Sequence, residues 1–152
     1  MHSAKTRKGN KRKLVIILSI IGGVVLLLAA MVIATTPGRD ELKNLVVADV
    51  DFGNLQDGVY TGAYRGTKDS FRNAAVEVTV ESGAVKKIKV TEGALAGDKQ
   101  ETKIGKGQTI KNLFDEIIEN QSLQVDVVSG ATLTSKAHLN AVENALKQAE
   151  GK

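Results

Sequence analysis

The hydrophobic pattern of this chain changes several times along its length. An uninterrupted apolar segment without a charged residue runs over 14–34. As a helix, a segment of this length covers about 30 Å, which is the thickness of the hydrocarbon core of a bilayer. The pattern therefore predicts one transmembrane helix at 14–34, preceded by a tail at 1–13. It is followed by a tether at 35–56 that mixes Pro, Gly and charged residues.

The remaining residues, 57–152, are expected to form one small domain. In its first half apolar and polar residues alternate with period two, which predicts a meander of about three antiparallel strands between residues 58 and 91. From residue 109 the apolar residues recur at helical spacing, which predicts a helix over 109–120. A closing helix is expected over about 135–148. Because the strands come first and the helices later, the fold class is α+β.

Charge is distributed unevenly along the chain. The first thirteen residues carry six of the 21 Lys and Arg residues and none of the 17 acids, so the rest has 15 cations against 17 acids. Positive flanks remain in the cytoplasm, which predicts a single-pass protein of the cell membrane with its domain outside. A signal peptide cleaved after Ala34 is the alternative. Secretory apolar regions are usually about 7 to 15 residues long, so the longer segment here favours a retained anchor.

The composition excludes several kinds of site. The chain has no Cys, so disulfides, thiolate zinc sites, iron–sulfur clusters and a Cys nucleophile are excluded. Two His residues leave no basis for an all-protein metal site. The slightly acidic domain without Trp gives no support for nucleic acid as a partner. No side chain is expected to be catalytic, and any redox chemistry must come from a cofactor.

Residues 126–135, with the sequence Asp-Val-Val-Ser-Gly-Ala-Thr-Leu-Thr-Ser, are the most informative segment. A β-branched run ends in a glycine turn that presents hydroxyl groups immediately before a helix. The unpaired N–H groups of the first helical turn and the cation of Lys136 favour an anion at this place. The simpler alternative is that Ser and Thr precede helices because they cap them. These residues alone leave both interpretations open.

This segment resembles the flavinylation motif of the FMN-binding domain family, which includes the covalent-FMN subunits of sodium-pumping NADH:quinone oxidoreductase and related ferredoxin-dependent complexes. The resemblance extends over about residues 57–149, from an opening strand at 57–64 through the Val-alternating hairpin to a closing helix at 141–146. It implies that FMN is joined by a phosphoester to Thr132. It also implies a separate Mg-dependent flavin transferase as a partner, with FAD as the donor.

The resemblance assigns cofactor binding to six residues: Asp126, Ser129, Gly130, Ala131, Thr132 and Thr134. The hydroxyl of Thr132 is expected to attack the pyrophosphate of FAD, while the two small residues before it keep the approach open. Ser129 and Thr134 are expected to hydrogen-bond the phosphate or to cap the helix, and Asp126 to serve the transfer.

The isoalloxazine ring needs a flat apolar partner, and the domain offers four aromatic residues: Tyr60, Tyr64, Phe71 and Phe114. Phe114 is expected in the core. For Tyr60 and Tyr64 cross-strand packing is as good an explanation as flavin stacking, so the sequence assigns no residue to the ring.

The sequence thus predicts a membrane-anchored extracytoplasmic electron carrier with covalent FMN, an electron-transfer flavoprotein rather than a stand-alone catalyst. Its expected partners are the flavin transferase, membrane lipid, an electron donor in the membrane and an extracytoplasmic acceptor. One alternative is an envelope module that binds or senses a flavin or another ligand without electron-transfer turnover. Another is an accessory subunit of a multi-subunit pump, against which the short length of the chain stands.

Overall fold

The computed structural model describes residues 6–151, without the side chains of residues 6–10 and 35. The first five residues of the expected basic tail lie outside the described residues. The chain divides into two compact units, Met1–Thr36 and Pro37–Lys152. Each unit is considered separately.

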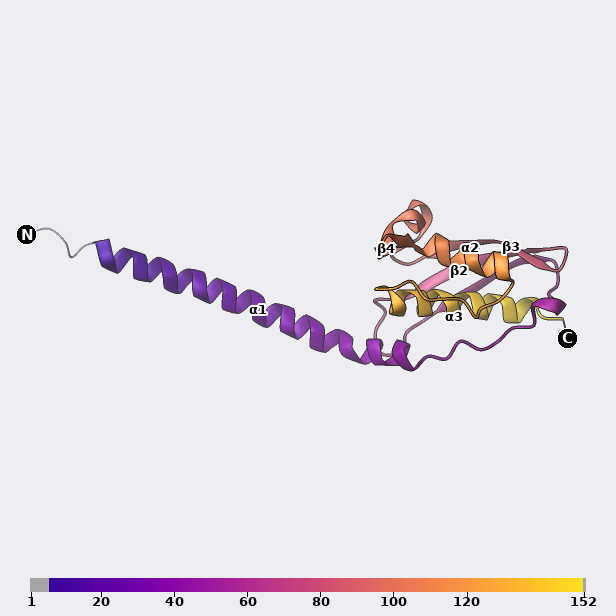
Figure 1. Ribbon diagram of the computed structural model, residues 1–152. Helices are drawn as coiled ribbons and strands as arrows, with labels where there is room; N and C mark the ends of the chain where they lie inside the picture. The colour runs from indigo at the N-terminus through magenta and orange to yellow at the C-terminus, as the bar shows by residue number, and fades with distance from the viewer. Residues whose placement is uncertain (1–5, 152) are drawn as a thin grey trace, which may run out of the picture. The chain divides into compact units, whose positions relative to one another are not determined.

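Helix α1 (Thr6–Asn44) begins in the first unit and contains the expected membrane segment (Figure 1). Its apolar side chains are exposed, Leu26 to 73% and Ile33 to 72%. Its most apolar stretch has a mean hydropathy of 3.0 and no buried residue. Among the described residues this is the one helix long and apolar enough to cross a membrane, a test of length and composition that a signal sequence also passes. The helix contains the segment predicted at 14–34 but is longer, since it begins within the expected tail and ends at Asn44 within the expected tether.

The second unit has the predicted α+β architecture (Figure 1). Its sheet is an antiparallel meander in the order β1 (Gly58–Tyr64), β2 (Ala74–Glu81) and β3 (Ala84–Glu92). Its two main helices are α2 (Ile110–Asn120) and α3 (Thr132–Ala149). The smaller elements are η1 (Phe52–Asn54), η2 (Gly97–Glu101), β4 (Lys103–Gly105) and β5 (Gln108–Thr109). The last three lie between β3 and α2, where the sequence pattern predicts no strand, because runs this short show no measurable period.

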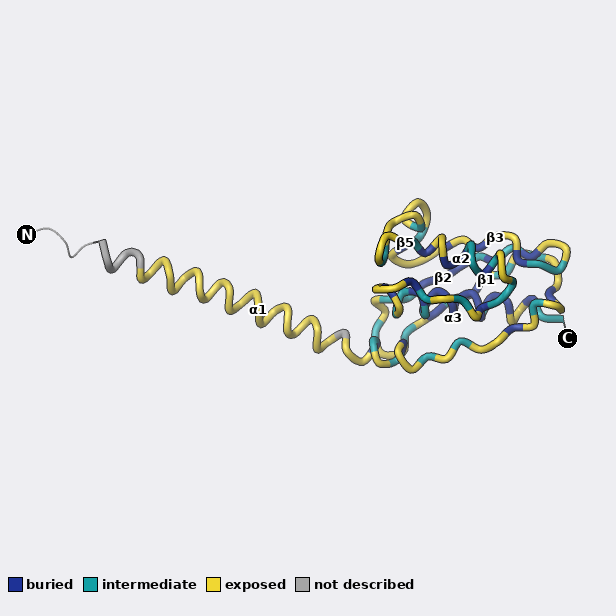
Figure 2. The backbone as a smooth tube through the Cα atoms, viewed as in Figure 1, coloured by how far each residue is buried: buried dark blue, intermediate teal, exposed yellow. Residues whose placement is uncertain are grey.

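The core is formed by the sheet together with the buried faces of α2 and α3 (Figure 2). Val76, Val78 and Val80 of β2 are at most 1% exposed, as their alternation predicted. Helix α3 crosses β1 at Gly62, where a Cβ atom would lie 2.1 Å from the carbonyl oxygen of Ala141. A glycine is therefore required at this crossing, because backbone from the helix occupies the space of a side chain.

The segment expected to be a tether is packed against the domain from Pro37 onward. Leu42 is 1% exposed, and Val50 and Leu55 are each 7% exposed within the same core. The carboxylate of Glu41 accepts the N–H groups of Thr67 and Lys68 at 3.0 to 3.1 Å. The packed unit thus begins before the expected start at Asp57. The sequence did not predict this, because the leucines and valines that enter the core are well separated and form no periodic pattern.

Candidate functional site

Residues 128–131 form a tight turn that leads directly into α3. The N–H of Ala131 donates to the carbonyl of Val128 at 2.9 Å, which closes the turn. Gly130, its third residue, has a φ of +84°. A turn of this kind needs the left-handed backbone that glycine adopts at little cost. Gly130 therefore has a structural role in the motif, in addition to the open approach expected from its size.

Ser135 connects this turn to the first turn of α3. Its side chain is fully buried, and its Oγ accepts the N–H of Val128 at 3.1 Å. The same hydroxyl donates to the carbonyl of Ala131 at 3.1 Å. Ser135 thus holds both ends of the turn, a role that its place in the sequence did not reveal.

We expect Ser135→Ala to loosen the turn, because the buried N–H of Val128 then has no partner. An unsatisfied buried donor costs about 1 to 3 kcal/mol, which for a domain of this size lowers the melting temperature by about 3 to 10 °C. Thermal unfolding followed by circular dichroism measures this. Ser129→Ala is the matched control, since Ser129 is exposed. Equal melting temperatures for the two variants would contradict the role of Ser135.

Thr132 is the first residue of α3 and is exposed. The N-cap position belongs to Ala131, which makes no side-chain capping bond, and the first backbone bond of the helix runs from the N–H of Ser135 to the carbonyl of Ala131 at 2.9 Å. The cap position is thus taken by a residue without a polar side chain, contrary to the capping alternative. The positive end of the helix and the hydroxyl of Thr132 are therefore presented together at the surface.

A hollow of about 300 Å³ lies at this helix end, lined by Arg72, Gly130, Ala131, Thr132, Leu133 and Thr134. Arg72 comes from the loop between β1 and β2 and is half-buried. Its Nη1 is buried without a hydrogen-bond partner in the described part of the chain. Its guanidinium carbon lies 5.3 Å from the centroid of the Phe71 ring, which is 65% exposed. A cation and an exposed aromatic ring therefore lie beside the motif.

Lys136, the cation that the sequence placed at this site, is engaged elsewhere. Its Nζ donates to the carbonyls of Lys43 at 2.7 Å and Leu45 at 3.0 Å, so it binds the C-terminal end of α1. The cation that lines the hollow is Arg72. No sequence pattern indicated that Arg72 would take this place, because it lies sixty positions before Thr132 and only the fold brings the two residues together.

The six residues expected at the site are not all brought together. Gly130, Ala131, Thr132 and Thr134 line the hollow. Asp126 is exposed and lines a different hollow of about 360 Å³, beside Lys136. Ser129 is exposed and does not line the hollow at Thr132.

The backbone of Ser129 is supported by the hairpin of β4 and β5. A Cβ atom at Gly105 would lie 2.3 Å from the carbonyl oxygen of Ser129 and 3.2 Å from the amide nitrogen of Ala131. The hairpin therefore fits closely against the turn at residues 128–131, and a side chain at Gly105 would push the hairpin and the turn apart.

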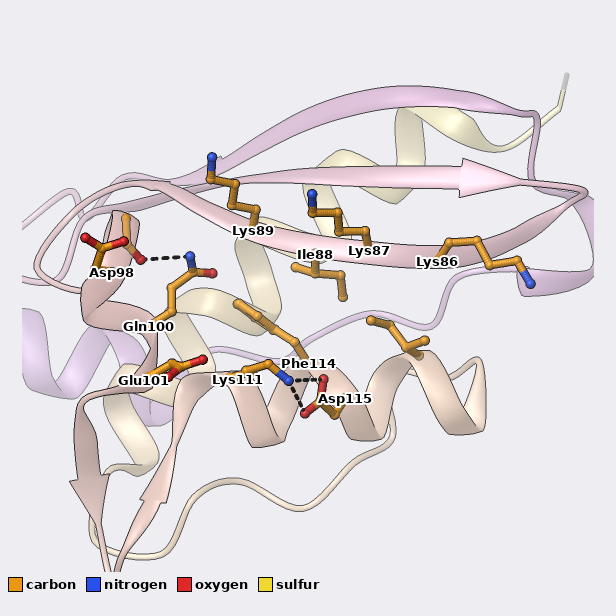
Figure 3. Close-up of a pocket in the computed structure, with 12 residues that line it drawn as sticks. Lys86, Lys87, Ile88, Lys89, Asp98, Gln100, Glu101, Lys111, Phe114 and Asp115 are labelled. Carbon is orange, nitrogen blue, oxygen red and sulfur yellow. Dashed lines mark hydrogen bonds and ion pairs between the residues drawn. The ribbon is translucent and has the colours of Figure 1, made fainter.

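A larger groove of about 600 Å³ lies between β3 and α2 (Figure 3). Ile88, Phe114 and Ile118 form its apolar part. Charged residues of both signs surround it, including the ion pair of Lys111 and Asp115 at 2.8 Å. It contains no residue of the 126–135 motif. The smaller hollow at Thr132 is therefore the candidate site.

A model of the FMN-binding domain matches residues 72–147, half of the chain, from β2 through the complete motif and into α3. The chain belongs to the FMN-binding domain family. This confirms the resemblance drawn from the motif and identifies FMN as the cofactor of the domain. Comparisons with curated proteins and with solved structures found no match.

A buried histidine lies one turn further along α3 in this FMN-binding domain. His138 is 4% exposed, and its Nδ1 lies 2.8 Å from the carbonyl oxygen of Thr134. Because a carbonyl can only accept, the proton of the neutral ring is on Nδ1. The other nitrogen, Nε2, is buried without a partner in the described part of the chain. Burial lowers the pKa of His138 below its usual value of 6.5.

The free energy of unfolding should therefore decrease as the pH falls below about 6.5. In this range the unfolded chain binds a proton at His138 while the folded chain does not, so acid favours unfolding until the lowered folded pKa is reached. The slope cannot exceed about 1.4 kcal/mol per pH unit for this one group. Urea unfolding between pH 7.5 and 5.5 measures it, with His138→Gln as the variant that lacks the slope. The same slope in both proteins would contradict this assignment.

Proposed function

We propose that this chain is a membrane-anchored electron carrier that holds FMN through a phosphoester to Thr132, with its domain outside the cytoplasmic membrane. The observation that carries the proposal is the exposed hydroxyl of Thr132 at the first position of α3, within the residues matched by the FMN-binding domain and within the segment that resembles the family's flavinylation motif. A hydroxyl at this position is accessible to an enzyme, whereas the hydroxyl of Ser135 is fully buried.

The residues of the hollow fit the phosphate end of FMN. Arg72 offers a buried nitrogen that has no partner among the described residues, and α3 begins without a side-chain cap. Both features favour a bound anion. When bound, FMN supplies one- and two-electron chemistry, and the protein supplies its position and surroundings.

The attachment step is a phosphoryl transfer onto Thr132. Its hydroxyl oxygen attacks the phosphorus on the FMN side of FAD, so that one bond forms between this oxygen and phosphorus. The bond from that phosphorus to the bridging oxygen of the pyrophosphate breaks, AMP leaves, and the hydroxyl proton passes to a base of the flavin transferase. The diester retains one negative charge, which the N-terminus of α3 stabilises.

A covalent bond suits a cofactor carried outside the cell. A non-covalent complex with a dissociation constant of about 10 nM has a binding free energy of about −11 kcal/mol and still loses its ligand on dilution. A phosphoester retains it at any concentration. The proposed partners are accordingly the transferase that installs FMN, an electron donor in the membrane and an extracytoplasmic acceptor.

The carrier function is tested by redox turnover of the flavinylated full chain. Membranes that oxidise NADH, mixed with the protein without oxygen, should bleach the flavin absorbance, and an added soluble acceptor should restore it. A Thr132→Ala chain in the same membranes is the control. Flavin that stays oxidised would contradict the carrier function and favour the sensing module.

The proposed orientation rests on the cations before the apolar segment, of which Lys11, Arg12 and Lys13 are exposed at the start of the described side chains. Protease added to intact protoplasts should digest the domain while a cytoplasmic marker survives. A domain that survives together with the marker would contradict the orientation, because the domain would then lie on the cytoplasmic side of the membrane.

A further inference from the structure

We propose that the loop between β1 and β2 supplies the second wall of the flavin site. In this inference Arg72 binds the phosphodiester on Thr132, and Phe71 stacks on the isoalloxazine ring. The inference rests on the proposed attachment at Thr132 and adds two residues that the motif does not contain.

The case for Arg72 begins with its unpaired nitrogen. Nη1 is buried, lies on a side chain that lines the hollow at Thr132, and has no acceptor within the described residues. A buried donor without an acceptor is costly, so an acceptor is expected in the functional state. A phosphodiester provides two unesterified oxygens, and the guanidinium group matches phosphate geometry.

A competing anion lies in the same loop. Asp69 is half-buried, and both Asp69 and Arg72 influence the pKa of Tyr64, which burial raises above its usual value. However, no ion pair joins Arg72 to Asp69 among the ion pairs of the described residues. Asp69 therefore does not neutralise Arg72 through an ion pair in the described part of the chain, and Nη1 remains the donor for an anion in the hollow.

The case for Phe71 rests on its exposure and its neighbour. The ring is 65% exposed, and Arg72 covers one of its faces at 5.3 Å. In FMN a flexible ribityl spacer separates the phosphate from the ring system, so a phosphate held in the hollow places the ring outside it. Phe71 contacts a residue of the hollow without lining it, and an exposed aromatic face is a suitable partner for a flat ring.

The two roles predict different defects. Loss of Arg72 should weaken phosphate binding, so Arg72→Gln should take up FMN about tenfold to a hundredfold more slowly, the effect of losing one charge-assisted hydrogen bond. Arg72→Lys restores the charge and should recover part of the rate. Phe71→Ala should be labelled at the rate of the unsubstituted protein, but its flavin should be more fluorescent and show weaker visible circular dichroism, because stacking quenches and orders the ring.

The experiment uses the full chain, a purified flavin transferase and FAD. The matched controls are Arg65→Gln, since Arg65 is exposed and paired with Glu92, and Val59→Ala, since Val59 is an apolar side chain that is 61% exposed. The ³¹P resonance of the labelled protein reports phosphate contact independently of recognition by the transferase. It should move in Arg72→Gln and stay in place in Arg65→Gln.

Each outcome separates this inference from the proposed function. An unlabelled wild-type chain with an active transferase contradicts the attachment at Thr132 itself. If the wild type is labelled, and both Arg72→Gln and Arg72→Lys show its labelling rate and its ³¹P resonance, the role of Arg72 is overturned. Equal flavin fluorescence in Phe71→Ala and Val59→Ala overturns the role of Phe71. If Arg72→Gln does not fold, the role of Arg72 is decided by comparing the labelling rate and the ³¹P resonance of Arg72→Lys with those of wild type.

Discussion

Replacing Thr132 by alanine should abolish covalent flavin completely while leaving the domain folded. The attachment needs the oxygen of this one side chain, so no partial labelling is expected. The side chain is exposed and the cap position belongs to Ala131, so its loss removes no capping bond. Alanine also favours a helix slightly more than threonine does. The melting temperature should therefore change by no more than about 2 °C.

The intact mass of the protein and flavin fluorescence in a denaturing gel measure the adduct. Thr134→Ala is the matched control, because Thr134 lines the same hollow two positions further on. It should keep the flavin, and Thr132→Ser should keep it as well, since a hydroxyl remains. Flavin that persists on Thr132→Ala would place the attachment on another residue.

Replacing Phe114 by alanine should have the largest effect on stability. The ring is 2% exposed, lies on the buried face of α2 and faces His138 with ring centroids 6.2 Å apart. Truncation of a buried aromatic residue costs about 3 to 5 kcal/mol, a large share of the roughly 5 to 15 kcal/mol that stabilises a typical domain. The melting temperature should fall by more than about 10 °C.

Phe71→Ala is the control for this effect, since it makes the same truncation at an exposed ring and should change stability by about 0.5 kcal/mol or less. Urea unfolding of the two variants compares them directly. A Phe114→Ala chain as stable as Phe71→Ala would show that this face of α2 does not stabilise the domain.

The elements that the sequence predicted well are those with a local period. The helical stripe of α2 is buried at Ile110, Leu113, Phe114 and Ile117, and the alternating valines of β2 point into the core. Burial in these elements depends on spacing along a few turns or residues, which the sequence displays directly. The motif before α3 was identifiable for the same reason, since its residues are consecutive.

The features that escaped prediction depend on contacts between distant segments. Lys136 binds backbone carbonyls of residues 43 and 45, and Arg72 takes the expected place of a cation near Thr132. Leu42 and Val50 enter the core from a segment that looked like a tether. No local pattern encodes such contacts, because they exist only when the chain has folded.

The central claim is that FMN is attached to the hydroxyl oxygen of Thr132, and peptide mapping of the flavinylated wild-type chain tests it most directly. Trypsin cleavage after Lys111 and Lys136 releases residues 112–136, which contain the whole motif. After co-expression with a flavin transferase, this peptide should gain the mass of one FMN less one water, and fragmentation should place the gain on Thr132. A folded chain that gains no mass beside an active transferase, or a gain located on Thr134 or Ser129, would contradict the account.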